Sequence, residues 1–117
     1  MAHTADSSAK AGIAEEKIAA AFEYESNPLF SDAERAALGL AQSAASVPNL
    51  ASDEDFAELR LYFSEEQIVE IVGVISLFGF LNRWNDTIGT ELEDHPTQFA
   101  QKTITASGWS VGKHTGD

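Results

Sequence analysis

The stretch from Ser64 to Gly89 constrains the fold more than any other part of this chain. Its middle has a single charged residue, Glu70, among aliphatic and aromatic side chains. Ser64 and Gln67 have the spacing of a capping box, in which a hydroxyl and a side-chain amide satisfy the free N–H groups of a first helical turn. A glycine at the other end is typical of a helix stop. The sequence therefore predicts one long buried helix over about residues 64–88.

This predicted helix is apolar on two sides. At about 100° per residue, one stripe consists of Ile68, Ile71, Val72, Ile75 and Phe78. The opposite side carries Leu77, Phe80, Leu81 and Trp84. The other predicted helices are too few and too short to cover both sides, and a large exposed apolar surface usually marks an interface. We therefore expect a homo-oligomer.

Two polar residues, Asn82 and Asp86, continue the first stripe one helical turn apart. In a structural interpretation, which we prefer, both side chains are mostly buried and bonded to backbone or to a cation of another segment. Replacing Asp86 by alanine would then cost about 1 to 3 kcal/mol, because a partner would be left unsatisfied. In the alternative interpretation the two residues form the floor of a pocket.

Helix signals recur along the rest of the chain. Ser31 and Ser52 precede sequences typical of helices, and the small-residue face expected on the first of these consists of Ala37, Leu38, Ala41 and Ala44. Residues 13–25 indicate a short helix with Ile18, Ala19 and Phe22 facing inward. We find no alternation typical of strands. The chain is therefore expected to be one all-α domain over residues 1–117.

Beyond Gly89 the periodicity is lost and glycines become frequent. This segment is predicted to be an irregular C-terminal tail that is laid over the helices. Phe99 and Trp109 are the side chains expected to anchor it, because a tryptophan on a free tail would expose a large apolar surface.

The composition excludes several classes of function. The chain has no cysteine, so it offers no disulfide, thiolate metal site or thiol nucleophile. A net charge of −12 argues against binding to nucleic acid, whose phosphates require a basic surface. The three histidines are far apart in the sequence, so we expect neither a metal nor a cofactor. Without an apolar run of about 18 residues or a signal peptide, we expect no membrane span and a cytoplasmic location.

Five segments stand in order over most of the chain: KAGIAEEKIAA, FSDAERAALGLAQ, FAELRLYFSEEQIVEI, FLNRWNDTIGTELE and GWSVGKH. Together they resemble the carboxymuconolactone decarboxylase family, and within it the alkylhydroperoxidase-like branch. The resemblance implies an all-helical fold, assembly into homo-oligomers and an antioxidant peroxidase activity.

The resemblance also implies an active motif, C-x-x-C-x-x-x-H at the start of a helix, assisted by an upstream glutamate. In such a motif a thiolate attacks the peroxide, a second thiol resolves the sulfenic acid, and the histidine and glutamate relay protons. His3 is the one residue here that can match the motif histidine. Both cysteines and the glutamate would precede it.

Three interpretations of this departure remain open. In the first, the chain is an N-terminally truncated and inactive member of the family. In the second, it is a degenerate member kept as an interaction subunit. In the third, it is a cysteine-free lyase that uses His3 with Asn82 or Asp86. We prefer truncation, because the missing part is contiguous and the other segments are intact. A thiol reductant would then be the partner of the complete enzyme.

Overall fold

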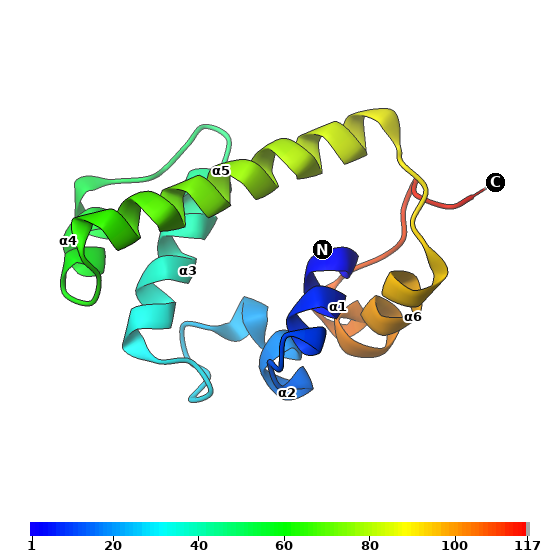
Figure 1. Cartoon of the computed structure of the whole chain (residues 1–117), viewed down its shortest axis with the longest axis horizontal. Helices are drawn as coiled ribbons and strands as arrows, with labels where there is room; N and C mark the ends of the chain where they lie inside the picture. The colour runs from blue at the N-terminus through cyan, green and yellow to red at the C-terminus, as the bar shows by residue number, and fades with distance from the viewer. Residues whose placement is uncertain (117) are drawn as a thin grey trace. The chain divides into compact units, whose positions relative to one another are not determined.

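The computed structural model describes residues 1–116. These residues form helices and contain no strand, which confirms the all-α class. The longer helices are α1 (Ala2–Lys10), α2 (Glu15–Ala19), α3 (Asp32–Ala45), α4 (Asp53–Arg60), α5 (Glu65–Ile88) and α6 (Asp94–Thr103) (Figure 1). Two short 3-10 helices, η1 (Ala21–Glu23) and η2 (Thr105–Ser107), follow α2 and α6.

Local hydrogen bonds start the helices where the sequence predicts. The hydroxyls of Ser31 and Ser52 each accept a bond from the backbone N–H three residues further on. At the start of α5, the Gln67 N–H donates to Ser64 Oγ over 3.2 Å, and the Ser64 N–H donates to Gln67 Oε1 over 2.9 Å. Gly89 then ends the helix at a positive φ of 64°, a conformation that side chains with a Cβ rarely adopt. The predicted bounds of the long helix are therefore confirmed.

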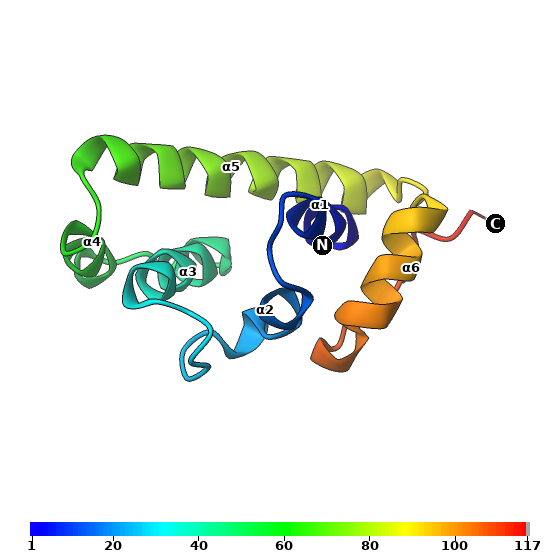
Figure 2. The same cartoon turned by 60° about the horizontal axis from the view of Figure 1, so that its bottom comes forward.

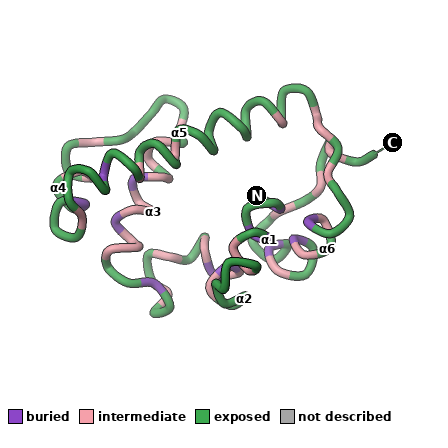
Figure 3. Tube along the Cα trace, viewed as in Figure 1, coloured by how far each residue is buried: buried purple, intermediate pink, exposed green. Residues whose placement is uncertain are grey.

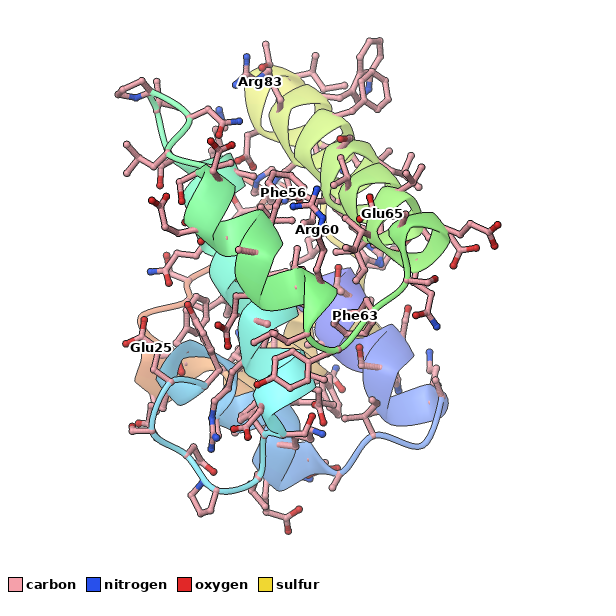
Figure 4. The ribbon with its side chains drawn as sticks, turned by 90° about the vertical axis from the view of Figure 1, so that its left-hand side faces the viewer. Glu25, Phe56, Arg60, Phe63, Glu65 and Arg83 are labelled. Carbon is pink, nitrogen blue, oxygen red and sulfur yellow. The ribbon has the colours of Figure 1, made fainter. Side chains whose placement is uncertain are left out.

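The contacts of the chain fall into two units, the first of which is residues 30–84. Its core is formed by α3, α4 and the first half of α5, and consists of Ala36, Leu40, Leu59 and Ile68. Phe56 and Phe63 pack against this core, and Arg60 Nε lies 2.7 Å from Glu65 Oε1 where α4 passes into α5 (Figure 4). On α3 the fully buried residues are thus Ala36 and Leu40, while Ala37 of the predicted small-residue face is partly buried against this core.

The second unit combines residues 1–29 with the chain from Asn85 onward. Here α1 packs against α6 and α2 (Figure 2), and the core consists of Ala2, Ala5, Ile18, Ala100 and Ile104. Ile18 is buried as predicted, but Phe22 is exposed, because the expected helix over residues 13–25 breaks into α2 and η1.

The predicted irregular tail is corrected by the presence of α6. Phe99 and Ala100 of this helix, and Ile104 directly after its end, pack in the core of the second unit. The docking of Trp109 is confirmed, since its side chain packs against the same core. Asp117, the last residue of the predicted tail, lies outside the described residues.

The predicted burial of α5 is wrong for this chain. Ile68 is its one buried residue, and Figure 3 shows the rest of the helix as intermediate or exposed. Val69 is 70% exposed and Phe80 is 61% exposed. The reason is that α3 and α4 contact only one face of the first half of this 24-residue helix and leave its other apolar side chains exposed. An apolar surface of this kind is typical of an interface.

Among the described residues, α5 is also the one helix that is long and apolar enough to cross a membrane, judged by length and composition alone. A helix that is covered by other protein passes the same test. The expectation that the chain has no membrane span therefore stays a prediction.

We expect the chain to assemble with further copies of itself in dilute buffer, because water-exposed apolar side chains along α5 favour burial. Sedimentation equilibrium at micromolar concentration should report a mass well above the 12.6 kDa of one chain. Phe80→Glu should weaken assembly, whereas Glu70→Gln, on the same helix, should leave it unchanged. A native chain that sediments as a stable monomer would contradict this expectation.

Candidate functional site

All three histidines lie in the unit formed by the two chain ends, and each stands beside a carboxylate. The separations are 3.2 Å, 3.2 Å and 3.0 Å, for His3 with Glu93, His95 with Asp6, and His114 with Asp86. Imidazole and carboxylate are the commonest groups for proton transfer near neutral pH. The unit therefore carries three acid–base pairs, which the sequence did not reveal because the partners lie far apart along the chain.

Two of these pairs lie together where α1 meets α6. His3 and Asp6 are three residues apart on α1, so they lie on the same face of that helix. Glu93 is the N-cap residue of α6 and His95 lies in its first turn. His3 Nε2 contacts Glu93 Oε2, and both side chains are more than half exposed. The structure thus gives the motif histidine expected from the resemblance a carboxylate partner that sequence analysis missed.

Asp6 is the one charged or polar residue that is buried within the described chain, with 4% of its surface exposed. Each carboxylate oxygen has a partner: Oδ2 lies 2.8 Å from Lys10 Nζ and Oδ1 lies 3.2 Å from His95 Nδ1. The hydrogen bond from Lys10 lowers the pKa of Asp6, burial acts in the opposite direction, and the nearby His95 lowers it further. Asp6 is therefore a carboxylate held in its charged form by two neighbours.

The third pair attaches the C-terminal segment to the end of α5. His114 Nδ1 lies 2.6 Å from the Thr90 carbonyl oxygen, and Nε2 lies 3.0 Å from Asp86 Oδ1. The backbone N–H of Leu92 also donates to the His114 carbonyl over 3.0 Å. Because both ring nitrogens face oxygen acceptors within protein, we assign this histidine a structural role.

The structure corrects the preferred interpretation of Asn82 and Asp86. Both residues are exposed, and the Asp86 side chain retains 70% of its accessible surface. The partner of Asp86 is His114 of the C-terminal segment, at 3.0 Å, but the expected burial is wrong. The exposed second half of α5 explains the difference. A pocket floored by these two residues stays a prediction.

No set of three or more histidine, aspartate or glutamate side chains among residues 1–116 is grouped closely enough to hold a metal ion. The arrangement at α1 and α6 is suited instead to moving protons. His3 and His95 each have one ring nitrogen 3.2 Å from a carboxylate oxygen, and both histidine side chains are more than half exposed.

Comparison with known proteins gives a likeness in structure. No protein-family description and no curated protein matches the chain. Two solved structures of the debrominase Bmp8 are similar at 35% sequence identity. One is a cysteine-to-alanine variant in complex with 2,3,4-tribromopyrrole, with a TM-score of 0.75, and the other is the ligand-free protein, with a TM-score of 0.74.

The match to the variant covers 81% of this chain and 51% of the debrominase chain. This chain therefore spans about half the length of the protein that it resembles. The likeness supports the helical fold described above.

Asp86→Ala should lower the free energy of unfolding by less than about 1 kcal/mol, because exposed ion pairs contribute little. Urea unfolding of the variant and the native chain at neutral pH measures the difference. A loss of several kcal/mol would restore the interpretation of Asp86 as a buried structural residue.

The lowered pKa of Asp6 predicts a pH dependence of stability. Ionised Asp6 stabilises the folded chain. Its contribution to the free energy of unfolding is complete above the pKa of an unfolded aspartate, about 3.9, and is lost as the pH falls through the lower pKa of the folded state. The native chain should therefore melt at a higher temperature than Asp6→Asn at about pH 5, and this advantage should shrink by about pH 2. An advantage that stays constant over this range would contradict the assignment.

Proposed function

We propose that this chain carries the cysteine-free helical part of a thiol-dependent reductase of the carboxymuconolactone decarboxylase family. The observation that carries the proposal is the likeness to debrominase Bmp8, at 35% identity over 81% of this chain. One of those structures has a cysteine replaced by alanine and holds a brominated pyrrole. The present chain has no cysteine, so the reactive thiols of the proposed enzyme lie outside it.

In the proposed reaction, His3 transfers the proton that accompanies reduction. If the substrate is a hydroperoxide, a thiolate attacks one oxygen, the O–O bond breaks, and the departing alkoxide takes a proton from His3. A second thiol then displaces water from the sulfenic acid and forms a disulfide, which an external dithiol reduces. Glu93 Oε2, 3.2 Å from His3 Nε2, is the carboxylate that orients the ring in this proposal.

Reductive debromination would also require two thiols and a proton donor. Two thiols supply two electrons, a C–Br bond is replaced by C–H, and the products are a disulfide, bromide and a proton. The carbon that loses bromine needs a proton donor, which is again the role proposed for His3. The likeness to the debrominase favours an organic bromide as a second candidate substrate, beside the hydroperoxide that the sequence resemblance suggests.

The proposed enzyme is a cytoplasmic homo-oligomer that uses a thiol reductant. The apolar face of α5 supports the oligomer, because its exposed side chains include Leu77, Phe80, Trp84 and Ile88. A cysteine-free lyase and an interaction subunit without catalytic activity are the competing functions, and the experiment below separates them.

The chain alone, supplied with a dithiol, should show only background turnover of an organic hydroperoxide and of 2,3,4-tribromopyrrole, because it has no thiolate. Reading the gene upstream of Met1 should reveal an in-frame C-x-x-C pair, and the protein that includes it should be active. In that longer protein, His3→Gln should lower turnover by about 100-fold or more.

His114→Gln is the matched control, because both ring nitrogens of this histidine are bound to Thr90 and Asp86, and the variant should leave turnover near the native rate. Robust turnover by the cysteine-free chain would refute the thiol-dependent reductase and favour a lyase if His3→Ala abolished it. An upstream sequence without cysteines, together with an inactive chain, would favour the interaction subunit.

A further inference from the structure

The helix α5 carries a second apolar stripe besides the one that meets the core of its unit. This stripe consists of Val69, Gly73, Leu77, Phe80 and Trp84, which recur every three or four residues and therefore share one face of the helix. The rings of Phe80 and Trp84 have centroids 6.2 Å apart, as expected for neighbours on that face. We call these five residues the outer stripe.

The outer stripe faces away from the core of its unit. The residues of α5 that meet this core, Ile68, Ile71 and Ile75, lie on the opposite side of the helix at about 100° per residue. On the outer stripe, Phe80 is 61% exposed and Trp84 is 57% exposed. Aromatic side chains exposed to this extent favour burial against another apolar surface.

Gly73 leaves an open notch in the outer stripe. A glycine in the interior of a helix weakens it, because glycine loses more backbone freedom on folding than any other residue. Gly73 is exposed, and an added Cβ would meet nothing within 4 Å. Packing among the described residues therefore gives no reason for a glycine here. The notch suits a large side chain from another molecule.

Side-chain size increases along the outer stripe. Val69 and Gly73 lie toward the N-terminal end of α5, whereas Phe80 and Trp84 lie toward its C-terminal end. Gly73 and Phe80 are equally far from the midpoint of α5, and so are Val69 and Trp84. A second copy that lies antiparallel on the stripe therefore places each large ring opposite a small residue, the alternation that close packing requires.

The charges beside the outer stripe favour the same orientation. Glu66 and Glu70 both lie in the N-terminal half of α5. A parallel pair of helices would bring each glutamate next to its own copy. An antiparallel pair separates the two copies of Glu70 by about 20 Å along the helix axis, and those of Glu66 by more. This separation exceeds the screening length of about 8 Å at physiological salt, so the repulsion is largely removed.

We propose that the outer stripe is a twofold interface with a second copy of this chain, in which Phe80 of each copy packs into the notch at Gly73 of the other. The two contacts are equivalent, as the symmetry of such a dimer requires. Leu77 lies near the twofold axis, and Trp84 faces Val69 of the other copy. The pairing rests on the homo-oligomer of the proposed function and adds its surface and orientation.

Gly73→Leu and Gly79→Leu form a matched pair of variants. Gly79 is also exposed with nothing within 4 Å of an added Cβ, but it lies about 120° from the middle of the outer stripe. Sedimentation equilibrium should show a dimer whose dissociation constant rises by about tenfold or more in Gly73→Leu, because the notch is filled, and is unchanged in Gly79→Leu. Circular dichroism should report native helix content in both variants.

A general attraction between apolar surfaces would be strengthened by either leucine. An unchanged or tighter association of Gly73→Leu would therefore overturn the proposed pairing and leave the homo-oligomer in place. The double variant Gly73→Leu with Phe80→Ala should recover part of the lost affinity, because the added leucine then faces the space that the phenylalanine leaves. A double variant that associates no better than Gly73→Leu would also contradict the contact.

The orientation can be tested with single cysteines, since the native chain has none. On oxidation, Leu77→Cys should give a disulfide-linked dimer, because this position lies near the twofold axis. Val69→Cys should not, because its two copies lie about 22 Å apart in an antiparallel pair, too far for a disulfide. A dimer formed as readily by Val69→Cys would indicate parallel helices and overturn the proposal.

A native chain that sediments as a monomer at about 50 µM would overturn a second copy as the occupant of the outer stripe. The cover would then come from residues of a longer protein. None of these measurements uses turnover, so their outcome is separate from that of the thiol-dependent assays.

Discussion

The contact between α1 and α6 is the interaction on which the candidate site depends. Its core is made of Ala2 and Ala5 on α1, Ala100 on α6 and Ile104 directly after the end of α6. Small residues let helix backbones approach closely, because interaxial distance follows the size of the side chains at the contact. That approach brings two residues of α1, His3 and Asp6, to the first turn of α6. Without it, neither acid–base pair would form.

The His3–Glu93 and His95–Asp6 pairs at this contact differ in how far their carboxylates are exposed to solvent. Glu93 and His3 are both more than half exposed, so this pair is open to partners supplied from outside the chain. Asp6 is buried, with Lys10 hydrogen-bonded to one carboxylate oxygen and His95 Nδ1 3.2 Å from the other. A carboxylate orients an imidazole well only where water does not compete for it.

The long helix α5 differs from this contact. Its own sequence specifies the helix strongly, but few residues from other elements pack against it. Its caps form and its backbone is regular over 24 residues, yet Ile68 alone is buried. Helix formation requires local hydrogen bonds and suitable side chains, whereas burial requires a second surface. Residues 30–64 cover one face of its first half and leave the remaining apolar side chains exposed.

The sequence by itself determined the all-α class and the start and end of the long helix, because capping bonds and glycine stops act over three or four residues. Ser64, Gln67 and Gly89 needed no distant partner to specify that helix. Tertiary structure alone decided that Leu40 of α3 is in the core, that Asp86 meets His114, and that Asp6 meets His95. These outcomes depend on residues far apart in the chain, whose approach no local pattern records. The long helix shows the same limit, since its sequence predicted an apolar surface but not which part of it this chain would cover.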